Sequence, residues 1–364
     1  MNLAQNTKIV LEDGSVFEGM SFGAKGSKLS EIVFNTSMVG YQEIISDPSY
    51  TGQAVVMTFP AIGNYGINDL DFESRRPGIN ALIVRYYCET PSHFECTETL
   101  GKTMERYGIT GVYGVDTRAL TRIIRERGSM KALITDISTP PEECQKLLSE
   151  FEYRHDSVFA ASRKEREIFP RDAAKYRVVA IDCGMKGNIV SCLNDLSVSV
   201  TVVPYDTSAA EIEALHPDGV FISNGPGDPE DVGEAIKTIR ELRGRYPIFG
   251  ICLGHQIISL AYGARTYKLK FGHRGGNHPV KDLKTGKIEI TSQNHSYAVD
   301  ANTLAGTGLE VTHINLLDQT VEGIACEQDL VFGVQYHPES APGPDDSRYL
   351  FTRFIKNMEK HKNA

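Results

Sequence analysis

One cysteine lies in a context that favours nucleophilic chemistry. Cys252 stands within the segment 250–254, GICLG, between an apolar run predicted to be a strand and a predicted helix. A sharp strand-to-helix turn is sterically tight, so glycines must flank the nucleophile, and the helix N-terminus favours a thiolate. The N–H of Leu253 can then donate to an oxyanion. Taken alone, a core cysteine in an ordinary turn is an equally good interpretation.

Two residues far along the chain could complete a catalytic set. His337 and Glu339 end the segment 333–340, GVQYHPES, which we expect to be a short strand with both side chains on one side. A histidine that accepts the thiol proton and is oriented by a carboxylate completes a nucleophile–base–orienter arrangement. For His337 alone, a surface histidine is the simpler interpretation, and its combination with Cys252 favours catalysis.

A glycine-rich segment, 223–229 with the sequence SNGPGDP, follows another predicted strand. Gly225 and Gly227 would let backbone N–H groups turn toward a ligand, as in an oxyanion hole or an anion nest. The alternative is a tight turn that only connects strand to helix.

Strands and helices alternate in the second half of the chain. Strands are predicted over 177–183, 198–205, 219–224 and 246–252, with helices between them, several short strands from 287 onward and a last helix at about 345–361. This pattern predicts an α/β fold, a mostly parallel sheet with helices on both faces. Ligands bind beyond the carboxyl ends of such strands, which is where the segments around Gly225 and Cys252 fall.

The first half predicts a smaller mixed α/β domain without a clean alternation. A hairpin at Asp13-Gly14, a buried strand over 81–87 and a helix over 117–127 capped by Asp116 are expected. The polar, aperiodic segment 151–175 is interpreted as a linker. We therefore expect domains at 1–150 and 176–364 on either side of it.

Composition excludes several classes of function. The chain has 364 residues with a formal net charge of -9 and no basic run, which disfavours nucleic-acid binding. No apolar stretch is long enough to cross a membrane, and no signal peptide is recognised, so a cytoplasmic location is expected. The seven cysteines form no C-x-x-C pair, which argues against a zinc site or a disulfide framework.

Three segments in this order, NGPGDP, FGICLGHQ and QYHPE, resemble the class I, triad-type glutamine amidotransferases over roughly residues 176–364. The resemblance implies that Cys252 attacks the side-chain amide of glutamine, that His337 is base and then acid, and that Glu339 orients it. It also implies oxyanion donors at Gly225 and Leu253 and a substrate contact at Gln256.

The first half is similar to the domain peculiar to the small subunit of carbamoyl-phosphate synthetases, in the segments 33–53, 59–68 and 111–132. That resemblance implies that Ser49 reaches the glutamine and that the segment 294–297 forms part of the substrate pocket, with Asn294, Ser296 and Tyr297. Many relatives have Gly and Phe where this chain has Ser296 and Tyr297.

The same resemblance implies a partner. The chain has no G-x-x-x-x-G-K-[ST] loop, so ATP and Mg²⁺ are expected on a large synthetase subunit and no cofactor on this chain. A heterodimer, or a higher oligomer of heterodimers, would pass ammonia internally to make carbamoyl phosphate, for either pyrimidine or arginine synthesis. The first domain is expected to be the docking surface. The alternatives are a non-catalytic scaffold of the same fold and another cysteine hydrolase, such as a peptidase.

Other conspicuous residues have simpler interpretations. Cys183 is expected to be a core residue, and His255 to pack locally rather than act as the base. His273 and His278 stand among glycines and hint at a metal. Because no acidic or cysteine partner stands at ligand spacing, we expect a loop there and no metal.

Overall fold

The computed structural model describes residues 5–363. They divide into two compact units, of which the first ends at Arg154 and the second begins at His155. Each unit has its own hydrophobic core, and each is described by itself. Within the described range, no helix has the length and apolar character that a membrane span requires.

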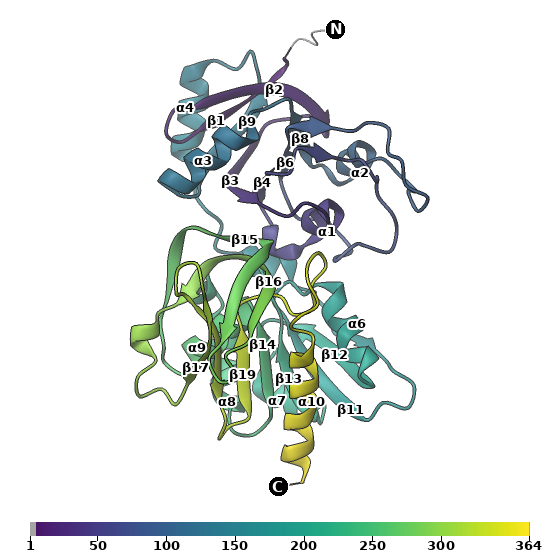
Figure 1. The fold of residues 1–364 in the computed structure, drawn as a ribbon, viewed down its shortest axis with the longest axis vertical. Helices are drawn as coiled ribbons and strands as arrows, with labels where there is room; N and C mark the ends of the chain where they lie inside the picture. Colours follow the sequence, from purple (N-terminus) through teal and green to yellow (C-terminus); the bar gives the residue numbers. More distant parts are fainter. Residues whose placement is uncertain (1–4, 364) are drawn as a thin grey trace. The chain divides into compact units, whose positions relative to one another are not determined.

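A closed barrel forms the core of the first unit (Figure 1). Around the barrel the order of the strands is β1-β2-β8-β6-β4-β3-β9. Their bounds are β1 Thr7–Leu11, β2 Val16–Gly23, β3 Lys28–Asn35, β4 Gln53–Met57, β6 Ala81–Ile83, β8 Thr110–Tyr113 and β9 Met130–Asp136. The predicted hairpin at Asp13-Gly14 is confirmed, since β1 and β2 pair antiparallel on either side of it.

Helices and a small sheet complete the first unit. They are α1 (Tyr41–Ser46), η1 (Pro48–Tyr50), α2 (Leu100–Tyr107), α3 (Thr117–Arg127) and α4 (Pro141–Glu150), with β5 (Ala61–Ile62) paired to β7 (Tyr86–Tyr87). The prediction that Asp116 caps α3 is confirmed, because its carboxylate accepts a hydrogen bond from the N–H of Ala119.

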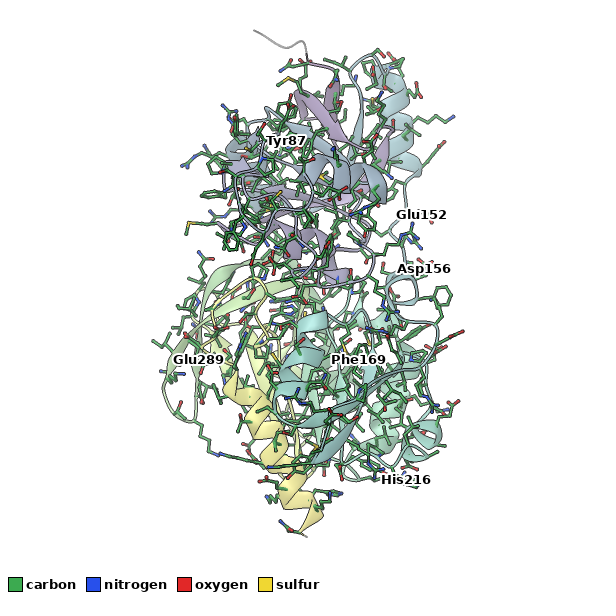
Figure 2. All side chains as sticks on the ribbon, turned by 90° about the vertical axis from the view of Figure 1, so that its right-hand side faces the viewer. Tyr87, Glu152, Asp156, Phe169, His216 and Glu289 are labelled. Atoms are coloured by element: carbon green, nitrogen blue, oxygen red, sulfur yellow. The ribbon has the colours of Figure 1, made fainter. Side chains whose placement is uncertain are left out.

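The prediction of one buried strand over 81–87 is wrong. The chain leaves the barrel after Ile83, and Tyr86 and Tyr87 pair with β5 instead. An apolar run does not reveal where its partner strand ends. The Tyr87 ring, labelled in Figure 2, stacks on Phe22 at a centroid distance of 4.2 Å and helps to close this core.

A large mixed sheet organises the second unit, in the order β10-β12-β11-β13-β14-β19-β18-β17-β15-β16. Neighbours from β12 to β19 are parallel, and the remaining pairs are antiparallel. The strands are β10 Glu167–Phe169, β11 Tyr176–Asp182, β12 Val198–Pro204, β13 Gly219–Ile222, β14 Ile248–Ile251, β15 Thr266–Asp282, β16 Ile288–Val299, β17 Glu310–Asn315, β18 Val321–Cys326 and β19 Val331–Val334.

Helices cover both faces of this sheet, which confirms the predicted fold class (Figure 1). One core contains side chains of α7, α8 and α9, and the other contains side chains of α6 and α10. The helices are α5 Ser157–Ala161, α6 Gly187–Asp195, α7 Ala209–Glu213, α8 Gly233–Leu242, α9 Leu253–Ala261 and α10 Tyr349–Lys362, with short 3-10 turns η2 Pro229–Asp231 and η3 Ala301–Thr303.

The segment 151–175, predicted to be a linker, contains α5 and β10. Phe169 of β10, labelled in Figure 2, packs against the core that holds α6 and α10. Arg163 in the same segment forms an ion pair with the buried Asp182, with 2.9 Å between Nη1 and Oδ2. The division into a docking domain and a catalytic domain stays a prediction.

Candidate active site

Cys252 occupies a strained corner between β14 and α9. Its backbone has φ 54° and ψ -105°, a positive-φ conformation that a residue with a Cβ rarely adopts. The glycines on either side are required by space: a Cβ on Gly250 would lie 2.6 Å from the backbone of Gly254, and one on Gly254 would lie 2.3 Å from Ile222 O. The predicted nucleophile elbow is therefore the observed local geometry.

The pairing of the parallel strands β14 and β19 brings His337 toward Cys252. β14 and β19 are neighbours, with Ile251 opposite Val334, and the N–H of Cys252 donates to Val334 O at 2.8 Å. His337 follows β19 by three residues. The predicted strand is shorter than expected, because it ends at Val334 and the chain bends before His337.

His337 and Glu339 form a buried pair. The distance from His337 Nδ1 to Glu339 Oε1 is 2.7 Å, and both side chains are almost fully buried. Burial lowers the pKa of His337, but Glu339 and Cys252 outweigh it and raise that pKa to about 10, so the imidazolium is the favoured form. Nδ1 is bound to Glu339, so Nε2 is the ring nitrogen left for the interaction with Cys252 that raises this pKa.

Lys186 contacts the same carboxylate oxygen of Glu339 as His337 does, and sequence reasoning missed it. Its Nζ lies 3.1 Å from Glu339 Oε1, with 3% of the lysine side chain exposed and none of the glutamate. It also donates to Ser340 O, and Asn188 donates to Glu339 O. Burial raises the pKa of Glu339, yet Lys186 and His337 lower it well below its usual range. Lys186 lies just beyond the carboxyl end of β11, and this position is the feature of the sequence that could have indicated it as a site residue.

The thiol faces two polar groups. Cys252 Sγ lies 3.6 Å from Asn294 O and 3.6 Å from the side-chain Nε2 of Gln335, a second residue that sequence reasoning missed. Gln256 Nε2 donates to Gln335 Oε1 at 2.9 Å and to Tyr297 O at 2.8 Å. Asn294, Gln256 and Tyr297 thus lie in one hydrogen-bonded group around the sulfur.

The other predicted pocket residues have these places. Gly225 follows β13. A Cβ there would lie 2.2 Å from Cys183 O and 2.9 Å from Leu253 Cδ2. The two residues predicted to donate to the oxyanion, Gly225 and Leu253, are therefore neighbours in space. Gly227 has φ +89°. The Ser296 hydroxyl accepts a hydrogen bond from Arg274 at 2.6 Å.

Ser49 lies in the first unit, in η1, where it is buried and its N–H donates to Asp47 Oδ1 at 2.9 Å. The role that the resemblance implies for it stays a prediction.

The simpler interpretations of Cys183 and His255 are confirmed. Cys183 belongs to a hydrophobic core, and burial raises the pKa of its thiol far above the usual range. His255 lies on α9 with no exposed surface, and burial lowers its pKa to about 3, so it is neutral.

The predicted loop around His273 and His278 is wrong. Both residues lie on the long strand β15, which pairs with β16 through two irregularities in register. Acidic partners are also present, because His273 Nε2 is 2.7 Å from Asp318 and its Nδ1 is 3.6 Å from Glu322. These carboxylates come from the 318–322 region, which spacing along the sequence could not connect with His273.

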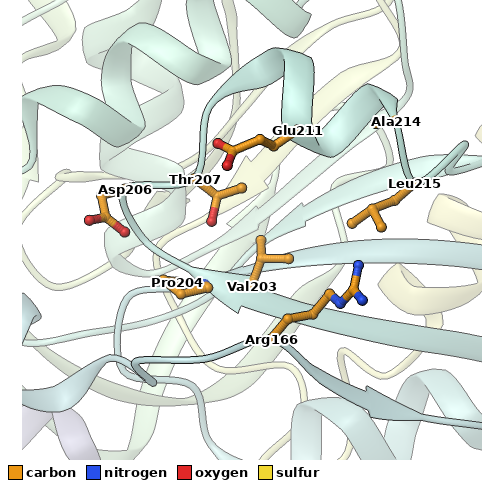
Figure 3. A pocket seen from close by; sticks show the side chains of 8 residues that line it. All are labelled: Arg166, Val203, Pro204, Asp206, Thr207, Glu211, Ala214 and Leu215. Carbon is orange, nitrogen blue, oxygen red and sulfur yellow. The ribbon is translucent and has the colours of Figure 1, made fainter.

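A hollow of about 750 Å³ lies at another place in the second unit (Figure 3). Its walls contain none of the predicted site residues. They are Arg166, Val203, Pro204, Asp206, Thr207, Glu211, Ala214 and Leu215, from the outer part of the sheet and α7. It is therefore not the place where Cys252 would act.

Comparisons with known proteins agree with these features. Residues 179–357 match the family model of the class-I glutamine amidotransferases, and residues 9–134 match that of the carbamoyl-phosphate synthase small chain, CPSase domain. The chain is similar to the carbamoyl phosphate synthase small chain of Fusobacterium nucleatum, at 50% identity over 98% of this chain and 99% of that one.

Two further relatives carry the same description. The chain is similar to the small chain from Staphylococcus epidermidis, at 52% identity over 97% of this chain and 96% of that one. It is also similar to the small chain from Bacillus caldolyticus, at 51% identity over 96% of this chain and 95% of that one.

Proposed function

The chain belongs to the carbamoyl phosphate synthase small-chain family, and we propose that Cys252, His337 and Glu339 carry out its glutamine hydrolysis. It is the glutaminase subunit that supplies ammonia for carbamoyl phosphate synthesis. The observation that carries the assignment is the buried His337, which is hydrogen-bonded to Glu339 and electrostatically coupled to Cys252.

The proposed chemistry has two halves. His337 takes the proton of the Cys252 thiol, and the thiolate attacks the side-chain amide carbon of glutamine, while the N–H groups of Gly225 and Leu253 donate to the oxyanion. His337 gives its proton to the nitrogen as the C–N bond breaks, so ammonia leaves and a γ-glutamyl thioester remains. Neutral His337 then takes a proton from water, which attacks the thioester and releases glutamate. The chemistry uses a cysteine and no cofactor.

The proposed glutamine pocket surrounds the thiol. In the second unit it comprises Gly225, Gly227, Leu253, Gln256, Asn294, Ser296 and Tyr297, and the contribution that the family resemblance implies for Ser49 stays a prediction. Support comes from the hydrogen bonds that join Gln256 to Tyr297 O and from the contact between Cys252 Sγ and Asn294 O. Arg274 fixes the Ser296 hydroxyl, so the serine that replaces the commoner glycine is already engaged within the protein.

A large synthetase subunit is the partner that the description of a small chain implies. We assign ATP and Mg²⁺ to that subunit and propose a heterodimer in which the first unit provides the docking surface. Large apolar side chains are exposed on this unit at Met38, Val39, Leu70 and Phe94, with Leu70 82% and Phe94 89% exposed. A cytoplasmic location belongs to the same proposal, and the free state of the seven cysteines fits a reducing compartment.

The test is Cys252→Ser in the complex with the large subunit. We expect glutamine-dependent synthesis of carbamoyl phosphate to fall at least a thousandfold while ammonia-dependent synthesis is largely kept, since only the nucleophile is lost (about 10³-fold or more for such residues). Cys88→Ser is the matched control, because Cys88 lies on the first unit and its thiol donates to Thr90 O. Both activities should be kept in that control.

Two outcomes would contradict the assignment. Glutamine-driven synthesis by the Cys252→Ser complex would show that another group is the nucleophile. No glutamate from the wild-type chain, with or without the partner, would favour a non-catalytic scaffold. Faster cleavage of peptides than of glutamine would instead favour a different cysteine hydrolase.

A further inference from the structure

Three buried side chains from three strands converge outside the triad. His273 on β15 and His295 on β16 are direct partners across the two strands, with ring centroids 4.9 Å apart. Glu322 reaches the same place from β18. Each residue offers one ligand atom, and these atoms all lie within 4.8 Å of one another.

The remaining polar atom of each side chain is already held. His273 Nε2 is 2.7 Å from Asp318 Oδ2, His295 Nδ1 is 2.7 Å from Tyr297 O, and Glu322 Oε1 accepts from Asn315 Nδ2 at 2.9 Å. Outer partners of this kind orient the ligands of metal sites in proteins.

Two of the inward atoms, His273 Nδ1 and Glu322 Oε2, are buried and have no hydrogen bond among the described residues. His273 Nδ1 lies 3.6 Å from Glu322 Oε1, within ion-pair distance. Buried polar groups of native proteins are normally satisfied, so unpartnered ones require an explanation. The Nε2 of His295 is 2.8 Å from Gln293 Oε1, a further oxygen at this place.

A third histidine lies beside this group. His278 Nδ1 is buried and has no hydrogen-bond partner among the described residues. Its ring centroid lies 5.2 Å from that of His273.

We propose that His273 Nδ1, His295 Nε2 and Glu322 Oε2 bind one divalent transition-metal ion of the zinc class. Two imidazole nitrogens and one carboxylate are a ligand set that Zn²⁺ and Co²⁺ accept, whereas Ca²⁺ and Mg²⁺ prefer oxygen alone. His278 or Gln293 would supply a fourth ligand.

The ion would act as a clamp and not as a catalytic group. It joins β15, β16 and β18, and its ligand His295 is hydrogen-bonded to Tyr297 O. The same carbonyl oxygen accepts from Gln256 Nε2, the proposed glutamine contact. Binding would therefore fix the strand that carries Asn294 and Tyr297.

The experiment uses the untagged full chain, freed of metal with a chelator and titrated with ZnCl₂ by calorimetry. We expect one ion per chain, a rise in Tm with zinc, and visible absorption bands when Co²⁺ replaces it. Glu322→Gln should lose the site. Asp318→Asn changes only a partly exposed outer group and should keep the fold while weakening binding about 10–100-fold.

Cys252→Ser is the companion variant, because the thiol and His337 could themselves capture zinc. One ion should still bind to it. Zinc retained by Glu322→Gln but lost in Cys252→Ser would place the ion at the triad and overturn the proposal.

The absence of any binding to the wild-type chain would also overturn it. His273 would then be a buried cation between two carboxylates. Burial lowers its pKa, but Asp318 and Glu322 raise it to about 9. Because the proposed site excludes the triad, its failure leaves the glutaminase assignment untouched.

Discussion

At Cys252 the backbone conformation and the chemistry are linked. A residue with a Cβ at φ 54° and ψ -105° costs about 1–3 kcal/mol relative to a relaxed backbone. The surrounding elements hold it there: β14 enters the corner, α9 leaves it, and the N–H of Cys252 is bound to Val334 O. The thiol is thereby turned toward Asn294 O and Gln335 instead of packing along the strand.

The strain predicts an inverted order of stability. Cys252→Gly should be more stable than Cys252→Ala by about 1–3 kcal/mol, because glycine adopts positive φ without steric cost. Denaturant unfolding of the two variants measures the difference. Cys326, at the end of β18, is the matched control, and there the glycine variant should be less stable by about 0.5–1 kcal/mol. Equal stabilities at position 252 would mean that the corner is not strained.

Glu339 sets the charge of His337, and this predicts a shift in pH dependence. The carboxylate raises the pKa of His337, so Glu339→Gln should lower it and the imidazolium should be lost at a lower pH. The alkaline limb of kcat/KM for glutamine should move to lower pH, with a smaller loss of rate than in His337→Asn. Glu310→Gln, at an exposed position of β17, should leave the profile unchanged. An unmoved limb would contradict the coupling.

The pair of His337 and Glu339 also makes the stability of the fold depend on pH, in a direction that the two pKa shifts define. The folded pKa of His337 is raised from 6.5 to about 10, so its contribution is fully present below pH 6.5. It is lost as the pH rises toward 10. The depressed pKa of Glu339 acts in the opposite sense, since its contribution is present above 4.5 and lost as the pH falls below that value.

At the scale of elements, the contact between α9 and β13 positions Cys252, the proposed nucleophile. Gly254 lies in the first turn of α9, directly against Ile222 O of β13. A side chain there would push the helix away from the sheet. The displacement would move Cys252 relative to His337, which arrives from β19.

Gly254→Ala should therefore destabilise the chain by about 1–3 kcal/mol, the usual cost of overpacking, and reduce glutaminase activity. Gly233→Ala is the matched control, because Gly233 opens α8 and has no atom within 4 Å of an added Cβ. The control should be neutral or more stable by up to about 1 kcal/mol. Thermal unfolding and a glutamate assay report both effects, and equal behaviour of the two variants would contradict the packing argument.

At the scale of the whole molecule, each unit has a core of its own, and the three residues of the proposed triad all lie within the second. Both units expose large apolar side chains, the first at Leu70 and Phe94 and the second at Leu317. We assign the docking role to the first unit because it contains none of the proposed triad residues.

Leu70→Asp and Phe94→Asp should each weaken binding of the large subunit, because a charge placed in an apolar interface loses its hydration. An affinity loss of about tenfold or more is expected for a residue that contributes at least about 1.4 kcal/mol. Leu317→Asp, at a 68% exposed position of the second unit, is the control and should bind normally. Calorimetric titration measures the affinities, and unchanged binding by both first-unit variants would exclude these side chains from the interface.

The sequence itself determined much of the local structure around the candidate site. The segment GICLG specified the corner at Cys252, because glycines on both sides are needed wherever a strand turns directly into a helix. Asp116 indicated the start of α3. The alternation of strands and helices predicted the sheet with helices on both faces. These features follow from local sterics and periodicity, which neighbouring residues along the chain decide.

Only the tertiary structure decided the rest. The ion pair between Lys186 and Glu339, the contact of Gln335 with the thiol, and the meeting of His273 with Glu322 each join distant segments. The apparent strand over 81–87 divided between two sheets for the same reason. Strand register and burial depend on which partners the fold supplies, and spacing along one chain does not contain that information.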